Sequence, residues 1–246
     1  MKIHSFESLA ALDGKGIRYA LFLGGCPLRC VYCHNPDTWT VEGCEDKSPE
    51  ELFNKIKRYK PYFKAGGGGV TFSGGEPLMQ AGELVLLADL LDKENIGYTV
   101  DTACSIPLTD DIKELLKRAE LVIVDLKFAD CESYKKFTRG DLPTVLSYLD
   151  YLKSISKTIW LRTVIVPGLN DNEAFIDSLA ELSAPYNEII EKYELLAFHT
   201  MGFFKYDSLG LVNPLENTPP LSVERKNTLQ QYLDTKRSML NNVFKA

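Results

Sequence analysis

The sequence predicts an α/β fold, a partial (β/α)6 barrel of parallel strands with an active site at the C-terminal strand ends. Short β-branched runs alternate with longer amphipathic stretches along the 246 residues, a pattern typical of βαβ units and a parallel sheet. Six such runs are too few for a closed eight-stranded barrel, so a partial barrel or a doubly wound sheet fits their number.

The predicted elements follow one another in a regular order. The β-branched runs predict strands at Ile17–Leu23, Gly69–Phe72, Gly97–Asp101, Leu121–Asp125, Thr158–Val166 and Glu191–Phe198. The amphipathic stretches predict helices at Pro49–Tyr59, Gln80–Lys93, Thr109–Arg118, Leu142–Ser154, Glu173–Leu182 and Val223–Leu240. We see no low-complexity segment, linker or exact repeat. We therefore expect one domain over residues 1–246, with a cysteine-bearing loop at 24–39 and a C-terminal extension from about residue 200 to 246.

Polar residues gather where the predicted strands end. Arg162 lies in the fifth predicted strand, and His199 follows the sixth. The other strands are followed or ended by the cysteine run, Ser73–Glu76, Asp101–Thr102 and Asp125–Lys127. In parallel α/β folds, ligand sites form at the carboxyl ends of the strands. We therefore expect these residues to share one site.

The overall charge and hydropathy exclude several classes of protein. A net charge of −6 and a pI near 5.2 argue against nucleic acid as the main partner, because phosphate binders normally present a basic face. No stretch approaches the roughly 20 apolar residues of a membrane span, and the polar start of the chain shows no secretory signal. We expect a cytoplasmic protein whose six cysteines are thiols or metal ligands rather than disulfides.

Three of the six cysteines lie within eight residues, at Cys26, Cys30 and Cys33. One interpretation is a zinc site completed by His34 or Cys44. His34 directly follows Cys33, which makes joint binding of one ion awkward, and Cys44 has no second ligand at the short spacing typical of paired zinc ligands. A second interpretation is structural thiols, which fits poorly with a polar loop interrupted by glycine and proline. A third is an iron–sulfur cluster held by three thiolates, with one iron left open for a substrate or cofactor.

The spacing Cys-x3-Cys-x2-Cys, with Tyr32 before the last cysteine, resembles the motif of the radical S-adenosylmethionine superfamily. Other stretches resemble the glycyl-radical-enzyme activases of that superfamily, in the same order along nearly the whole chain. They are Asp13–Arg18 (DGKGIR), Tyr32–Trp39 (YCHNPDTW), Gly67–Leu78 (GGGVTFSGGEPL), Val124–Lys127 (VDLK), Trp160–Asp171 (WLRTVIVPGLND) and Phe198–Gly202 (FHTMG). The cysteine motif by itself indicates only the superfamily.

The resemblance implies a set of cofactors and a chemistry. Cys26, Cys30 and Cys33 would be the catalytic and metal ligands of a [4Fe–4S] cluster, and S-adenosylmethionine would chelate the open iron through its amino and carboxylate groups. One electron from the cluster would cleave the sulfonium, and the resulting 5′-deoxyadenosyl radical would abstract hydrogen from the substrate. The cofactor carries that chemistry, while the protein supplies binding and orientation.

The resemblance also implies contacts to the methionine part of S-adenosylmethionine. Gly74, Gly75 and Glu76 would meet its amino group, because glycines allow a close backbone approach and a carboxylate accepts from an ammonium. A simple Gly-rich turn is the alternative. Lys127 would meet its carboxylate, with Arg162 as a second candidate.

Further contacts are implied on the adenosyl side. Tyr32, Val164 and His199 are expected to line the cofactor site, with His199 stacking on or hydrogen-bonding the adenosyl part. The oxygen-rich group Asp101, Thr102 and Asp125 is expected to help bind a monovalent cation. Capping of the helices that follow is the ordinary alternative for these three residues.

The resemblance places Asp13 and Arg18 at the glycine loop of a protein substrate. The long insertion that carries two further clusters in many activases is absent, which favours the type that activates pyruvate formate-lyase. Lys15 stands where the family has proline, and Ala103-Cys104-Ser105 stands where it usually has Asn-Gly. We expect these departures to face the peptide substrate and not the cofactor.

The function expected from the sequence is therefore the anaerobic activation of pyruvate formate-lyase by a radical enzyme. The expected electron donor is flavodoxin or ferredoxin, and the expected state is a monomer. One alternative is an activase of a different glycyl radical enzyme. The alternative from another class is a non-enzymatic zinc or iron–sulfur electron-transfer module.

Overall fold

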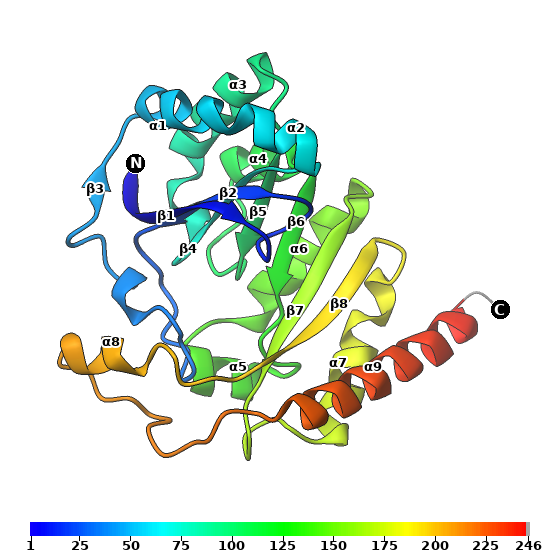
Figure 1. Ribbon diagram of the computed structural model, residues 1–246. Coiled ribbons are helices and arrows are strands. Elements are labelled where there is room, and N and C mark those ends of the chain that lie inside the picture. The colour runs from blue at the N-terminus through cyan, green and yellow to red at the C-terminus, as the bar shows by residue number, and fades with distance from the viewer. Residues whose placement is uncertain (245–246) are drawn as a thin grey trace.

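An open, eight-stranded sheet organises residues 1–244, the part of the chain that the computed structural model describes (Figure 1). Its strands stand in the order β3-β1-β2-β4-β5-β6-β7-β8. Their bounds are β1 Lys2–Ala10, β2 Arg18–Leu23, β3 Glu45–Asp46, β4 Gly69–Gly74, β5 Tyr98–Thr102, β6 Leu121–Asp125, β7 Ile159–Ile165 and β8 Ile190–Ala197.

The six strands β2 and β4 to β8 are parallel and pair in chain order, which confirms the predicted partial (β/α)6 barrel. Leu23 stands opposite Gly74 and Asp125 opposite Arg162, so the carboxyl ends of the strands meet at one rim. In the described chain β2 and β8 do not pair, so the barrel stays open between them. Residues that follow different strands can therefore reach one common space.

The edge strand β1 was not predicted. It runs antiparallel to β2, and β3 in turn pairs with its first residues. The stretch Ser5–Leu9 of β1 is exposed. Because an edge strand that faces water needs no apolar alternation, its sequence carried no strand signal.

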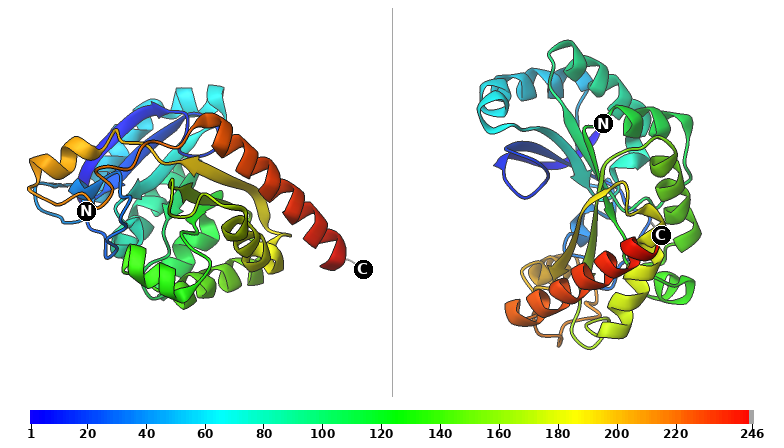
Figure 2. Two further views of the ribbon diagram at one scale, coloured as in Figure 1. Left: turned by 90° about the horizontal axis from the view of Figure 1, so that it is seen from below. Right: turned by 90° about the vertical axis from the view of Figure 1, so that its right-hand side faces the viewer.

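The helices lie between the strands and after them. Their bounds are α1 Pro49–Ile56, α2 Lys60–Gly66, α3 Ala81–Lys93, α4 Asp110–Arg118, α5 Cys131–Thr138, α6 Leu142–Ser154, α7 Glu173–Ser183, α8 Phe203–Ser208 and α9 Val223–Phe244. Figure 2 shows the green and yellow helices α4 to α7 gathered on one face of the sheet. The predicted helix at 49–59 ends as α1 at Ile56 and is followed by a short 3-10 turn and α2, while α5 and α8 were missed.

Helix starts and buried strands are explained by local chemistry. Ser48 and Glu51 form a capping box at the start of α1, and Asp130 caps α5. The first four residues of β6, Leu121–Val124, are fully or almost fully buried because both faces of a central parallel strand are covered. Among the helices described, none is long and apolar enough to cross a membrane. The division into one domain stays a prediction.

Candidate active site

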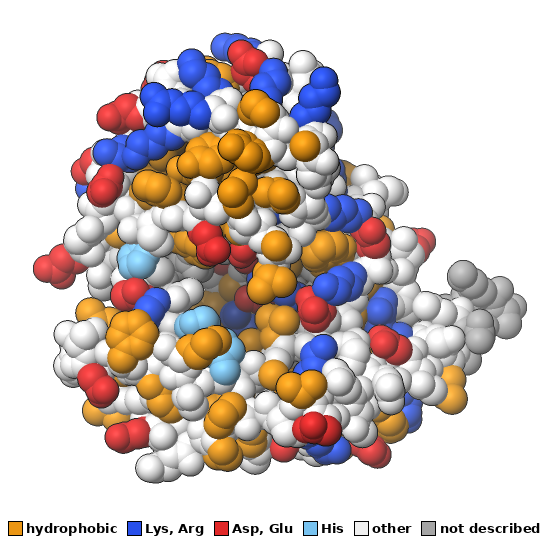
Figure 3. Space-filling view, in the orientation of Figure 1, with side chains coloured by type: hydrophobic (Ala, Val, Ile, Leu, Met, Phe, Trp, Pro, Cys, Tyr) orange, Lys and Arg blue, Asp and Glu red, His pale blue; other side chains and the backbone are white. Residues whose placement is uncertain are grey.

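A chamber of about 500 Å³ lies at the carboxyl ends of the parallel strands. A smaller inner pocket of about 180 Å³ shares part of its wall, including Tyr32, Asp101 and Asp125. The space-filling view shows the hollow with histidine and acidic side chains near its border (Figure 3). The larger volume is within the range of roughly 300–1,000 Å³ that small-molecule sites occupy.

Most of the predicted site residues are brought together here. The lining of the chamber or of the inner pocket includes Asp13, Cys26, Cys30, Tyr32, Cys33, Gly74, Gly75, Asp101, Thr102, Asp125, Lys127, Arg162, Val164 and His199. Arg18 and Glu76 do not line either space. Residues from the ends of separate strands therefore line one shared space.

The three clustered cysteines all line the inner pocket, together with Lys127. Burial raises the pKa of Cys26 to about 11 and that of Cys30 to about 12, and it also raises the pKa of Cys33. The three groups are therefore thiols near neutral pH until a metal displaces their protons.

The donor set of this pocket suits an iron–sulfur cube. Within residues 1–244, no three His, Cys, Asp or Glu side chains converge as the ligands of one ion would. In a [4Fe–4S] cube each thiolate binds a different iron, so three cysteines around one pocket can serve it without meeting at a point. Soft thiolates are the ligands that iron–sulfur clusters require, and the pocket shares part of its wall with the larger chamber.

The cysteine-bearing loop at residues 24–39, called the cluster loop from here on, is joined to the glycine loop, residues 74–76, at the end of β4. The Glu76 amide donates to the Gly25 carbonyl at 2.8 Å, and the Gly75 amide donates to the Leu23 carbonyl at 2.9 Å. A Cβ on Gly75 would lie 2.3 Å from the Gly25 carbonyl oxygen and 2.8 Å from that of Thr38. Only glycine allows this approach of two backbones, so Gly75 sets the position of the cluster loop.

Two helices that the sequence did not predict hold the other side of the cluster loop. Amides of Arg29 and Val31 donate to carbonyls at the C-terminal end of α5, at 2.8 and 2.9 Å. From α8, the Tyr206 hydroxyl donates to the Cys33 carbonyl at 2.9 Å. Gly202 precedes α8, and a Cβ there would lie 2.4 Å from the His34 carbonyl oxygen. The loop is therefore fixed on both sides.

Glu76 has a different position from the one predicted. Its carboxylate is fully buried and accepts from the Thr102 hydroxyl at 2.6 Å, the Ala103 amide at 3.1 Å and the Ser105 hydroxyl at 3.1 Å, as well as from the Leu78 amide. With its oxygens satisfied internally, it is not free to accept from the cofactor's ammonium. The structure corrects that expectation: Glu76 ties the glycine loop to the end of β5.

A row of alternating charges, which we call the charged rim, lies at the carboxyl ends of the strands. The Arg162 guanidinium pairs with Asp101 and, at 3.2 Å, with Asp125, which also accepts from Lys127 at 3.2 Å. Although burial disfavours its charge, Lys127 and Arg162 together lower the pKa of Asp125. Burial raises the pKa of Asp101, against the opposing effect of Arg162. Arg162 thus contacts both carboxylates that were expected to flank a monovalent cation.

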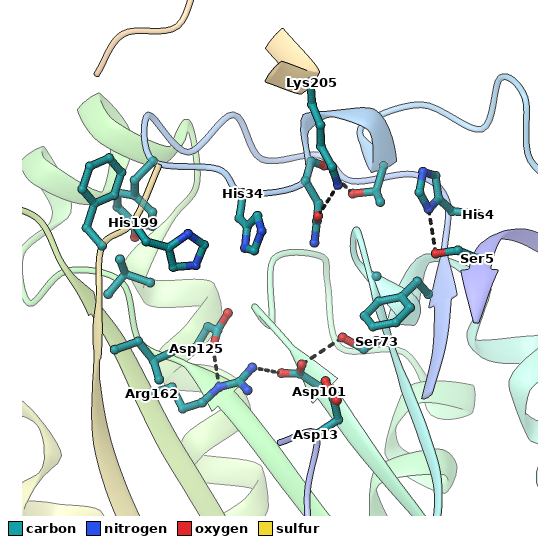
Figure 4. A pocket seen from close by; sticks show the side chains of 18 of the residues that line it. His4, Ser5, Asp13, His34, Ser73, Asp101, Asp125, Arg162, His199 and Lys205 are labelled. Carbon is teal, nitrogen blue, oxygen red and sulfur yellow. Dashed lines mark hydrogen bonds and ion pairs between the residues drawn. The ribbon is translucent and has the colours of Figure 1, made fainter. Parts of the chain in front are cut away.

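All three histidines of the chain line the chamber. No local pattern predicts this convergence, because the three residues lie far apart in the sequence. The His34 and His199 rings meet edge to face, with centroids 4.4 Å apart. Burial, with His199 and Lys205 nearby, lowers the pKa of His34. Among the described residues, the buried Nδ1 atom of His199 has no hydrogen-bond partner, and Figure 4 shows both rings across the chamber from Arg162.

Asp13 and Arg18 are five positions apart in the sequence, but only Asp13 lines the chamber. Asp13 lines the chamber, where burial and the nearby Asp101 raise its pKa. Arg18 is the first residue of β2 and is only 1% exposed, with its guanidinium donating to Thr71, Thr99 and the carbonyls of Lys15 and Val70. A buried side chain at the amino ends of the strands has no surface for an incoming loop, so the predicted substrate contact of Arg18 was wrong.

Two departures from the family pattern also lie elsewhere than expected. Lys15 extends to Glu191 at the start of β8, 2.5 Å away, at the amino end of the barrel. Cys104 is fully buried with φ 51°, the left-handed backbone region that favours glycine. Neither side chain faces the chamber, so we correct the expectation that they meet a peptide substrate. Of Ala103, Cys104 and Ser105, only Ala103 lines the inner pocket.

Comparison with known proteins agrees with this site. Residues 21–179 match the radical SAM superfamily, a span that contains all three clustered cysteines and the charged rim. Because this match covers more than half of the chain, the protein belongs to the radical SAM superfamily, as its sequence resemblance predicted.

Individual relatives cover almost the whole chain. It is 40% identical over 232 residues to the pyruvate formate-lyase-activating enzyme of Clostridium pasteurianum, covering 94% of this chain and 96% of that protein. It is 36% identical to the enzyme of the same name from Staphylococcus epidermidis, covering 94% of each.

Solved structures share the fold. A radical SAM methyltransferase from Sphaerobacter thermophilus superposes with a TM-score of 0.64 at 16% identity, over 92% of this chain and 68% of that one. A domain of the pyruvate-formate lyase-activating enzyme from Bacteroides vulgatus superposes with a TM-score of 0.54 at 24% identity, over 69% of this chain and 94% of that one.

Proposed function

We propose that this protein activates pyruvate formate-lyase by generating a radical on a backbone glycine of that enzyme, with a [4Fe–4S] cluster and S-adenosylmethionine as cofactors. When bound, the reduced cluster would supply the one electron for cleavage of S-adenosylmethionine to methionine and a 5′-deoxyadenosyl radical, and transfer of a hydrogen atom from the glycine would give 5′-deoxyadenosine and the glycyl radical. The residues of the chain hold the cofactors, orient them and admit the glycine.

Cys26, Cys30 and Cys33 would hold the cluster, and no fourth protein ligand is needed. The Lys127 ammonium lies at the same pocket and favours the thiolate form of Cys30. The iron without a cysteine would then be available to the methionine part of S-adenosylmethionine. This use of the empty fourth position is the interpretation that the cysteine spacing favoured.

The charged rim supports binding of that methionine part. Asp101 and Asp125 are balanced by Arg162 and Lys127, so the wall offers both signs of charge to a group that carries an ammonium and a carboxylate. Lys127 is proposed for the carboxylate and the Gly74–Gly75 backbone for the ammonium. Val164, His199 and Tyr32 are proposed on the adenosyl side, where they line the chamber.

The open side of the barrel supports a protein as the substrate. A glycine within a folded loop needs a wider entrance than a small molecule, and within the described residues the sheet does not close between its β1–β3 edge and β8. Asp13 lines the chamber and is proposed to contact the entering loop. The three cysteines around one pocket, in a chain so similar to pyruvate formate-lyase-activating enzymes, carry the proposal.

The decisive experiment is glycyl radical formation under anaerobic conditions. Reconstituted protein, dithionite, S-adenosylmethionine and purified pyruvate formate-lyase should yield 5′-deoxyadenosine and a glycyl radical signal in electron paramagnetic resonance. Cys30→Ser should abolish both products. Cys44→Ser should leave both intact, because Cys44 does not line the pocket. Stoichiometric zinc without iron would contradict the proposal.

A different glycyl radical enzyme as partner is the second candidate. Ala103 lines the inner pocket where related activases usually have asparagine, so this wall of the site is altered. Cleavage of S-adenosylmethionine without a radical on pyruvate formate-lyase would favour this candidate. A panel of purified glycyl radical enzymes in the same assay would then identify the partner.

Several accompanying features are part of the proposal. We propose a cytoplasmic monomer that takes its electron from flavodoxin or ferredoxin, and a monovalent cation near Asp101, Thr102 and Asp125. Cation binding would require Arg162 to share its two carboxylates. Activity assays in which sodium is replaced by potassium or by a large organic cation would test the last point.

A further inference from the structure

The segment His34–Thr38, which we call the roof, follows the last cysteine of the cluster loop and forms one wall of the chamber. His34, Asn35 and Thr38 line the chamber, and Pro36–Thr38 form a short 3-10 helix. The roof lies between β1 and α8, which belong to opposite sides of the open sheet. Backbone pairing between β1 and β8 does not close the described sheet. The Gly25 amide donates to the Thr38 carbonyl at 2.9 Å, and side-chain contacts connect the roof to β1 and to α8.

Asp37, in the middle of the roof, is contacted from both sides. The Nε2 atom of His4 in β1 lies 3.2 Å from its Oδ2 atom. The Nζ atom of Lys205 in α8 lies 3.0 Å from the same oxygen and 3.1 Å from Oδ1. Lys205 also donates to Asn35 Oδ1 at 2.6 Å. One carboxylate therefore joins three segments that are far apart in the sequence.

These contacts differ from an ordinary surface ion pair. The side chains of His4, Asp37 and Lys205 are 26%, 25% and 21% exposed, whereas those of the Lys2–Asp46 pair between β1 and β3 are 43% and 72% exposed. Exposed pairs contribute little because water and salt screen them. Partly buried, charge-assisted hydrogen bonds are stronger, and the three acceptors around Lys205 match the three hydrogens of its ammonium.

The contacting residues are themselves part of the chamber. His4, Asn35 and Lys205 line it, and Figure 4 shows Lys205 and His4 on the same side as His34. A shift of the roof would therefore change the wall beside His34 and His199. A ligand held between the roof and the charged rim would lose affinity, because a mobile wall must be ordered on binding.

We propose that Asp37 is a positioning residue that, with His4 and Lys205, forms a clasp between the two sides of the open barrel. The clasp fixes the roof and so prepares the chamber for S-adenosylmethionine. This inference rests on the proposed function in one respect, since it places that cofactor in the chamber.

The test compares Asp37→Asn with Asp46→Asn in the anaerobically reconstituted holoenzyme. Both variants remove one carboxylate charge that pairs with β1, but only Asp37 touches the chamber roof. Titration of S-adenosylmethionine is followed by the change it causes in the reduced cluster's paramagnetic resonance signal. Asp37→Asn should raise the titration midpoint about tenfold, the size of one lost charge-assisted contact, and Asp46→Asn should leave it unchanged.

Hydrogen–deuterium exchange supplies a readout that does not depend on the cofactor. In Asp37→Asn, amides of residues 34–39 and 203–208 should exchange faster than in the wild type, while amides at the amino ends of the parallel strands should not. Lys205→Arg should retain most of the clasp, and Lys205→Met should lose it. Combined with Asp37→Asn, Lys205→Met should add little, since both variants break the same contact.

The outcomes separate the clasp from the proposed function. An unchanged midpoint together with unchanged exchange in Asp37→Asn would overturn the clasp. A wild-type protein that holds iron but shows no response to S-adenosylmethionine would instead contradict the proposed function, and the exchange data would still decide on the clasp. If Asp37→Asn loses iron, His4→Gln decides by the same two measurements, because His4 lies outside the cluster loop.

Discussion

Two buried arginines stand at opposite ends of the barrel, and their surroundings differ. At the carboxyl ends of the strands, Arg162 contacts the carboxylates of Asp101 and Asp125 and lines the chamber. At the amino ends, Arg18 donates to neutral hydroxyl and carbonyl oxygens, and its nearest carboxylate, that of Glu120, is 3.8 Å away. The carboxylates raise the pKa of Arg162 against the effect of burial, whereas burial lowers that of Arg18.

This difference shows that two buried arginines can have different roles in one barrel. Arg18 fills the lower end of the barrel and pairs backbone groups that would otherwise lack partners. Arg162 balances two carboxylates at a surface that a ligand can reach. A buried arginine is therefore informative about function only when its partners are known.

The largest expected effect is that of Arg162→Met. The change leaves Asp101 and Asp125 close together without their shared cation, which breaks a buried charge network and costs about 3–5 kcal/mol. Cleavage of S-adenosylmethionine should fall by at least about a hundredfold, measured as 5′-deoxyadenosine released per cluster-loaded protein. Arg162→Lys should recover only part of it, because an ammonium cannot pair with both carboxylates in the same planar geometry.

Arg18→Met should act on stability and not on the chemistry. The variant leaves buried acceptors such as the Val70 carbonyl without a donor, so unfolding in urea should show a loss of about 2–4 kcal/mol. The rate of cleavage per folded, cluster-loaded protein should stay within about twofold of the wild type. A drop as large as that of Arg162→Met would contradict the assignment of Arg18 to the structural end of the barrel.

Two glycines sharpen the same contrast. At the carboxyl ends of the strands, a Cβ on Gly75 would collide with the Gly25 carbonyl. At the amino ends, a Cβ on Gly68 would lie 1.7 Å from the Ile17 carbonyl oxygen. Both alanine variants should lose stability by about 1–3 kcal/mol. Only Gly75→Ala should also lose iron on purification, because it displaces the cluster loop. Equal iron contents in both variants would contradict this role of Gly75.

The smallest expected effect is a pH dependence at the charged rim. The pKa of Asp125 is lowered in the folded protein. Its stabilising contribution is therefore present above the ordinary carboxyl pKa of about 3.9 and is lost only as pH falls through the lowered value. In Arg162→Met the two carboxylates should repel, which raises the pKa of the pair. From pH 7 to pH 5, stability in urea should then increase by about 1 kcal/mol more in the variant than in the wild type, where burial already raises the pKa of Asp101.

Much of the architecture could be predicted from local patterns. The run Leu121–Asp125 matches β6 residue for residue, and the helix predicted at Leu142–Ser154 matches α6. The strand β6 is one short apolar run, and α6 buries residues at helical spacing, and both patterns are visible in the sequence. The strand β1 and the short helices α5 and α8 were missed, because an exposed edge strand and helices of eight and six residues leave too little periodicity.

By itself the sequence determined the parallel α/β order, the cysteine spacing and the gathering of polar residues after the strands. Each of these depends on neighbours within a few residues. Only the tertiary structure decided that Asp13 lines the chamber while Arg18 does not, that Glu76 is satisfied internally, and that Asp37 joins His4 to Lys205. These outcomes depend on contacts between distant segments, and a pattern of residue types does not show which way a polar side chain turns when the barrel assembles.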